Sequence, residues 1–181
     1  MALGAILLMN GCTLGLGQAG IKPDVTPLAA SIKLSGPVVV TVYDERAVSW
    51  LGDPGAVGGH IDISDTLGEG VKQAIEATLE DAGMTPDNSS EAPQFQVYID
   101  TLNYSIPAGE FLSYIDLTAN IRVNVRTDEG TYQNIYSARE RRSLKSVPEK
   151  EDSLVMVNEI LTMAINRAFE DRKLIDYIGG L

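Results

Sequence analysis

The sequence predicts a single α+β domain, a two-layer sandwich in which two helices pack on one face of a mostly antiparallel sheet, in the order β-α-β-β-β-α. The first observation is that residues 115–126 alternate apolar and polar side chains without interruption, which is typical of a strand with one buried and one hydrated face. The second is that two longer segments, 64–82 and 149–169, carry apolar residues at helical spacing. Two such helices bury their apolar stripes when both cover the apolar face of one sheet.

The first predicted strand, residues 38–43, is a run of mostly β-branched residues, VVVTVY, which favours a strand that is central in the sheet or buried on both faces. The next segment, 51–60, contains four glycines and a proline. It predicts a loop that is long enough to have a function of its own. A helix then begins near Ser64 or Asp65, either of which is a good N-cap, and it ends at Gly83.

The remaining elements follow from local alternation, turn residues and helical spacing. In chain order they are a polar turn at 87–90, a half-buried strand at 94–100, the strand at 115–126, a hairpin turn at 127–130, its partner strand at 131–138, a helix beginning after Pro148 and a last helical turn at 174–178. The alternation in these strands favours an antiparallel sheet that is covered on one side only.

Composition limits the class of partner. The chain has 14 Lys and Arg against 25 Asp and Glu, a formal net charge of −11 at pH 7. Nucleic-acid binding requires clustered cations that neutralise phosphates, so we expect no nucleic-acid partner. Glycine and proline are frequent in residues 13–36, which favours a tether that leads into the domain.

Residues 1–9 form the only continuous apolar run, which is far shorter than the ~20 residues of a membrane-spanning helix. Its length suits the apolar core of a signal peptide. Such peptides begin with Lys or Arg, and the first basic residue here is Lys22. We therefore expect a signal peptide whose start is truncated or misassigned.

The segment Leu8–Cys12, LMNGC, resembles the lipobox of bacterial lipoproteins. The resemblance implies cleavage before Cys12 and a lipid on its thiol. Because Thr13 stands where Asp would retain a lipoprotein in the inner membrane, it also implies an outer-membrane anchor facing the periplasm. The alternative is a free buried thiol, the usual state of a lone cysteine, but the flanks of Cys12 offer no core. The expected organisation is a signal peptide at 1–11, a lipidated tether at 12–36 and one domain at 37–178.

Two sets of residues are candidates for contact with a partner. Asp44 and Arg46 leave the first strand on the same side, either as a charged contact site or as a surface ion pair of little energetic consequence. The hydrated sheet face is either a platform for a partner or simply a solvated face, with Arg122 and Arg126 as its charged members. Its other polar residues are Asn120, Asn124, Gln94, Gln96 and Tyr98.

The basic cluster is the third surface feature, in an otherwise acidic chain. It could meet anionic headgroups or simply be the solvated end of a strand. Its members are Arg139, Arg141, Arg142 and Lys145.

The sequence offers few groups of residues that could perform catalysis or bind a metal or a cofactor. His60 is the only histidine, and it could join Asp53, Asp62 and Asp65 around a cation, but the spacing fits no EF-hand and Asp65 is explained as a helix cap. The GxGxxG at 15–20 has no strand before it and no helix after it, as a dinucleotide loop requires. No nucleophile is paired with a base. We expect no metal, no cofactor and no enzymatic activity.

Four segments carry a resemblance to a known family. They are Asp44-Glu-Arg46, LEDAGM at 79–84, FQVYIDTLNY at 95–104, and a closing helix with Asn158, Leu161 and Ala168 before LIDY at 174–177. Over residues 37–178 the layout resembles the YajG-type family of uncharacterised Gram-negative lipoproteins. The resemblance implies a lipid-anchored envelope protein and brings no established activity or catalytic residue.

The function expected from the sequence is a non-enzymatic lipoprotein, bound to the membrane through its anchor, whose periplasmic domain docks an envelope protein or a cell-wall component. A second hypothesis is an accessory subunit of a lipid or solute transport complex. A third is an enzyme that uses the loop at 51–65.

Overall fold

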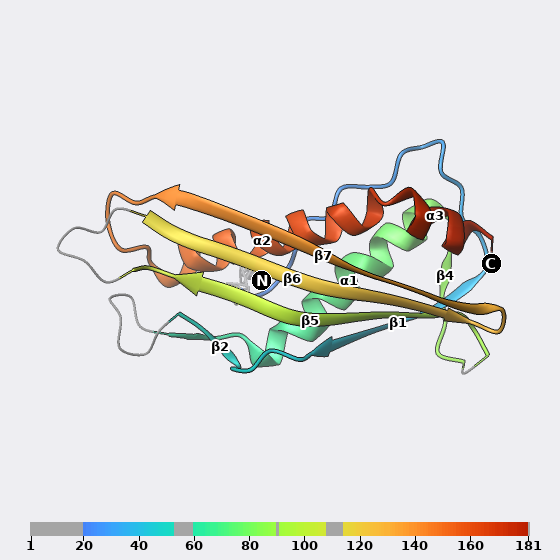
Figure 1. Cartoon of the computed structure of the whole chain (residues 1–181), viewed down its shortest axis with the longest axis horizontal. Helices are drawn as coiled ribbons and strands as arrows, with labels where there is room; N and C mark the ends of the chain where they lie inside the picture. Colours follow the sequence, from blue (N-terminus) through green and yellow to red (C-terminus); the bar gives the residue numbers. More distant parts are fainter. Residues whose placement is uncertain (1–19, 53–59, 90, 108–113, 181) are drawn as a thin grey trace, which may run out of the picture.

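The computed structural model describes residues 20–52, 60–89, 91–107 and 114–180, and it confirms the predicted α+β class. Five strands form a mixed sheet in the order β4-β1-β5-β6-β7, and β2 pairs with β3 in a separate two-stranded sheet (Figure 1). The elements in the described part of the chain are β1 (Pro37–Asp44), β2 (Trp50–Leu51), β3 (Ile61–Asp62), α1 (Ser64–Ala82), β4 (Thr85–Pro86), β5 (Gln94–Ser105), β6 (Tyr114–Thr127), β7 (Gly130–Ser143), α2 (Lys150–Phe169) and α3 (Arg172–Gly179).

Strands β5, β6 and β7 form a long antiparallel meander that makes up most of the sheet. The predicted hairpin turn is confirmed, because Thr127 pairs with Gly130 across it. β5 and β7 run further than the sequence predicted, to Ser105 and Ser143. The alternation in β6 separates two faces: its inward side chains are 0–1% exposed, and they are Ile115, Leu117, Ala119, Ile121, Val123 and Val125.

β1 is the one long strand whose expected environment was wrong. It pairs in parallel with β5, and its other neighbour is the two-residue β4. Val38 and Val40 are buried under the helices, whereas Tyr43 is 40% exposed. The β-branched run therefore belongs to a strand near the sheet edge with one covered face, because β-branched residues suit either face of a strand.

The helices cover one face of the sheet, α1 over β1 and α2 over β6 and β7 (Figure 1). Neither Ser64 nor Asp65 caps α1 with its side chain. Instead, Asp62 Oδ1 accepts hydrogen bonds from the Ser64 backbone N–H at 3.0 Å and its hydroxyl at 2.7 Å. Gly83 ends the helix with φ +111°, as predicted. No helix in the described residues is long and apolar enough to cross a membrane.

The glycine-rich segment at 51–60 is not a loop over its whole length. Leu51 pairs with Ile61 and Trp50 with Asp62, so the two ends of the segment close as a short antiparallel hairpin. Leu51 is 1% exposed. Residues 53–59 lie outside the described part of the chain.

Residues 20–36, which we name the strap, are packed on the helices, although the sequence predicted a tether over 12–36. Ile21 and Leu34 are 4% and 6% exposed. The Leu34 backbone N–H donates to the Ala82 carbonyl oxygen at 2.9 Å. The tether prediction thus applies at most to residues 12–19, which lie outside the described part.

Asp171 connects the short helix α3 to β7. Its Oδ2 accepts hydrogen bonds from the hydroxyls of Tyr132 at 2.6 Å and Tyr136 at 2.8 Å, and from Asn134 Nδ2 at 3.1 Å. Its Oδ1 caps α3 by accepting from the Lys173 backbone N–H at 3.0 Å. These bonds, led by that from Tyr132, hold the pKa of Asp171 well below its usual range.

We predict that Asp171→Ala destabilises the domain by about 2 kcal/mol at pH 7, because it removes a helix cap and leaves the buried Tyr136 hydroxyl without its acceptor. Chemical denaturation measures the change, with Asp176→Ala on exposed α3 surface as the control. Since a carboxylate with a lowered pKa stabilises above about pH 4 and loses that effect as pH falls towards its folded value, the difference should shrink between pH 4 and pH 2. A difference that is the same at pH 7 and pH 2 would contradict this assignment.

Candidate functional site

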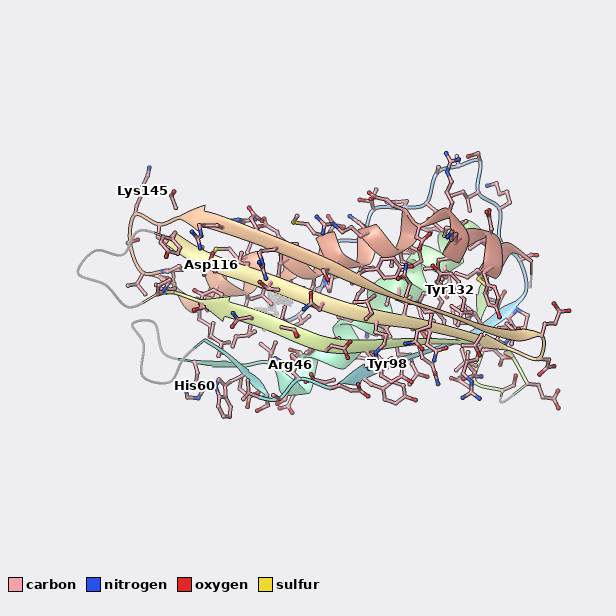
Figure 2. All side chains as sticks on the ribbon, viewed as in Figure 1. Arg46, His60, Tyr98, Asp116, Tyr132 and Lys145 are labelled. Atoms are coloured by element: carbon pink, nitrogen blue, oxygen red, sulfur yellow. The ribbon has the colours of Figure 1, made fainter. Side chains whose placement is uncertain are left out.

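The candidate site is the outer face of the sheet, the face turned away from α1 and α2. No helix in the described residues packs on it. Figure 2 locates Tyr98 and Asp116 on its strands. Its side chains alternate with the buried ones; on the three meander strands they include Gln94, Gln96, Tyr98, Asp100, Asp116, Thr118, Asn120, Arg122, Asn124, Arg126, Thr131, Gln133, Ile135, Ser137, Arg139 and Arg141.

The strand register places the polar residues that the sequence grouped together next to one another. Gln94 lies opposite Arg126, Gln96 opposite Asn124, and Tyr98 opposite Arg122. Asn124 Oδ1 is buried and has no hydrogen-bond partner in the described residues. The outer face is therefore a continuous surface of amides and hydroxyls rather than a set of isolated side chains.

A row of four side chains crosses the outer face from β1 to β7. Tyr43 is paired with Tyr98, Tyr98 with Arg122, and Arg122 with Ile135. The rings of the two tyrosines stack with centroids 4.8 Å apart, and the Arg122 guanidinium lies 4.3 Å from the Tyr98 ring centroid. We call this set the cross-strand row. Ile135 is 59% exposed, the most exposed of the large apolar side chains in the described part of the chain.

Arg122 is neutralised within the protein. Its Nη2 donates to Glu45 Oε2 at 2.6 Å and to Asp100 Oδ1 at 2.9 Å. The hydrogen bond to Asp100 is the largest cause that raises the pKa of Arg122 above its ordinary value, and the bond to Glu45 adds to it. The sequence did not indicate that Glu45 is a partner of Arg122. Only the parallel pairing of β1 with β5 brings the chain at the end of β1 beside Arg122.

Asp44 and Arg46 form a close ion pair in which the arginine side chain is buried and the aspartate is exposed. Arg46 Nε and Nη2 each donate to a different Asp44 carboxylate oxygen at 2.7 Å, and Nη2 also donates to the Ser49 carbonyl oxygen at 3.1 Å. The Arg46 side chain is only 2% exposed. Burial alone would raise the pKa of Asp44, but the bonds from Arg46 outweigh it and the pKa is lowered. The pair fixes the chain where it leaves β1.

Two of the four members of the basic cluster, Arg141 and Arg142, are compensated by carboxylates. Arg141 pairs with Asp116 at 2.7 Å, and Arg142 pairs with both Glu140 and Glu159. Arg126 is exposed and, among the described residues, forms no ion pair. The other two members of the basic cluster, Arg139 and Lys145, are exposed and form no ion pair among the described residues, so this end of the sheet keeps part of its positive charge.

The candidate cation ligands lie apart or have other partners. The His60 ring meets Trp50 edge to face with centroids 6.1 Å apart, and Asp62 bonds to Ser64. Asp65 stands in the first turn of α1. Asp53 lies outside the described residues, and within them no three His, Cys, Asp or Glu side chains are grouped to hold a metal ion. Cys12, the predicted lipid attachment site, also lies outside them.

Two solved structures are similar to this chain at low sequence identity, and the first of them shares its fold. Protein XCC0632 from Xanthomonas campestris is similar with a TM-score of 0.56 and 9% identity, over 87% of this chain and 98% of that chain. The rare lipoprotein B from Shewanella oneidensis has a TM-score of 0.48 and 10% identity, over 77% of this chain and 96% of that chain. At such identities the likeness concerns the fold alone. No curated protein matches this chain.

A family model described as uncharacterized lipoprotein matches residues 23–179. The match includes most of the strap, the whole sheet and all three helices. Because it covers well over half of the chain, this protein belongs to that family of uncharacterized lipoproteins.

Proposed function

We propose that this protein is a non-enzymatic lipoprotein of the YajG type, anchored in the outer membrane through a lipid on Cys12, whose periplasmic domain binds another envelope component with the outer face of its sheet. Membership of a lipoprotein family and the lipobox-like LMNGC before the domain support the anchor. Two or three acyl chains hold a protein on a bilayer stably, where one does not.

The observation that carries the docking proposal is the cross-strand row on the uncovered sheet face. Tyrosine, arginine and large apolar side chains are the residue types that dominate binding energy at protein interfaces. Here Tyr98 and Arg122 are held rigidly by stacking and ion pairs, and Ile135 projects beside them at 59% exposure. A rigid side chain loses little conformational entropy when a partner binds.

The surroundings of the row indicate how the partner is recognised. The arginines Arg122 and Arg141 are already paired with carboxylates of the same face. Arg122 therefore adds little net charge at the row itself, and the amides and hydroxyls around the row supply hydrogen bonds. These properties suit an envelope protein or a cell-wall component that offers polar groups around an apolar contact.

The lipid anchor is tested by Cys12→Ser. We expect the variant to incorporate no labelled palmitate and to leave the membrane fraction or remain unprocessed, because the chain has no other cysteine to carry the lipid. Metabolic labelling followed by membrane fractionation measures both effects, with Ser35→Ala in the strap as a matched neutral change. Equal labelling of the Cys12→Ser variant and the wild type would refute the anchor.

The docking face is tested by a photo-crosslinking residue placed in intact cells at Ile135 on the outer face or, as a control, at Val155 on α2, which is similarly exposed at 55%. We expect a discrete adduct from position 135 only, identified by mass spectrometry. An envelope protein or a cell-wall fragment would support the proposal, and a subunit of a membrane transporter would favour the transport-accessory hypothesis. The same adducts from both positions, or none from position 135, would contradict docking at this face.

A further inference from the structure

The strap is bound to α2 by a polar ladder with a regular spacing. The backbone N–H groups of Lys22, Asp24 and Thr26 donate to side-chain oxygens of α2 at 2.7, 2.9 and 3.0 Å. The acceptors, every fourth residue of the helix, are Asn158 Oδ1, Thr162 Oγ1 and Asn166 Oδ1. Two residues of extended chain advance ~6.7 Å and four residues of helix ~6 Å, so the two repeats stay in register over the ladder.

Two of the acceptor side chains also donate back to the strap. Asn158 Nδ2 donates to the Gly20 carbonyl oxygen at 3.2 Å, and Asn166 Nδ2 donates to Thr26 Oγ1 at 3.0 Å. Each asparagine thus uses both ends of its amide on the same segment. This arrangement recognises an extended backbone at a defined position, which a passive linker does not require.

On the opposite side the strap touches α1 at a glycine. A Cβ built on Gly70 would lie 1.9 Å from the Ile21 carbonyl oxygen, closer than any side chain permits. Gly68, two residues earlier on the same helix, has nothing within 4 Å of such a Cβ. The absence of a side chain at Gly70 is therefore what lets the strap lie between α1 and α2.

The strap is packed much less completely than the core. Ile21, Pro23 and Leu34 are its only fully buried side chains. The strap borders one open pocket of about 350 Å³ together with α1, around Gln73 and Ala77, and another of about 600 Å³ together with α2 and α3, around Phe169 and Ile175. Its other apolar contacts come from Val25, Leu28 and Ile32, which are only partly buried against the core. A segment held mainly by exposed hydrogen bonds and partly buried side chains opens locally at a free energy below that of global unfolding.

We propose that the strap is a releasable clamp on the membrane tether. The proposal rests on the proposed lipidation of Cys12. With the strap docked, roughly eight residues separate the anchor from the domain, a reach of at most ~27 Å. With the strap released as far as β1, roughly 25 residues separate them, a reach of up to ~85 Å. Docking keeps the domain near the bilayer, and release lets its outer face meet partners deeper in the periplasm.

The local opening is tested by amide hydrogen exchange on the full chain carrying Cys12→Ser, so that the result does not depend on the lipid. We expect the amides of Lys22, Asp24 and Thr26 to exchange more slowly than those of an unfolded chain. Their exchange rate should not change at low denaturant concentrations, because the opening is local. Gly70→Ala should speed their exchange at least tenfold without changing the β6 amides, whereas Gly68→Ala should not. Thr162→Val, which removes one acceptor and keeps the shape of the residue, should speed exchange at Asp24.

Either of two exchange results would overturn the clamp. If the strap amides of the Gly68→Ala chain exchange as fast as those of an unfolded peptide, the strap does not dock. If they exchange as slowly as the β6 amides under all conditions, the strap detaches only when the whole domain unfolds.

The change in reach is tested on the lipidated chain in vesicles that contain an acceptor-labelled lipid, with a donor dye on Gln133→Cys in the outer face. We expect energy transfer to fall at least twofold in Gly70→Ala relative to Gly68→Ala. Equal transfer from two vesicle-bound variants would overturn the tether role. Failure of both variants to float with vesicles would instead overturn the lipid anchor, and the exchange data would still decide whether the strap opens.

Discussion

One-sided burial of the sheet is the constraint on which the rest of this structure depends. The apolar residues of β6 all project to one side, where they are almost wholly buried, and its polar residues project to the other. Helices α1 and α2 must cover the first side because an exposed apolar face of this size is unfavourable in water. The second side needs no cover, since its exposed side chains are mostly polar, and Arg122 and Arg141 are paired with carboxylates.

The two helices also create the place where the N-terminal segment lies. Both helices lie on the same face of the sheet, and the strap contacts α2 through Asn158, Thr162 and Asn166 and α1 at Gly70. The family match begins at residue 23, inside the strap. The strap is accordingly part of the shared unit, and the domain boundary that composition suggested at residue 37 lies too late in the chain.

Local pattern was sufficient to predict the elements whose signals are local. The β6–β7 hairpin, the Gly83 end of α1 and the start of α2 after Pro148 follow from alternation, a left-handed glycine and helical spacing. The parallel pairing of β1 with β5 was not predictable in this way, because VVVTVY is compatible with either face being buried. The strap was missed for a related reason: Lys22 and Asn158 are 136 residues apart, and an asparagine on a helix surface carries no local sign of its acceptor role.

The same reasoning explains why the site was predicted only in part. The outward residues of β5 and β6 could be grouped from alternation alone, and the register places them together. The burial of the Arg46 side chain was not predictable from alternation, because Arg46 lies after the end of β1 and its contacts are with Asp44 and the Ser49 carbonyl oxygen. The proposed function uses the two sides of the sheet for different purposes. The strap lies on the helix side of the domain, so the strap and the outer face do not share a surface. Under the proposed clamp, a change in the length of the tether would alter where the outer face is presented without altering the face itself.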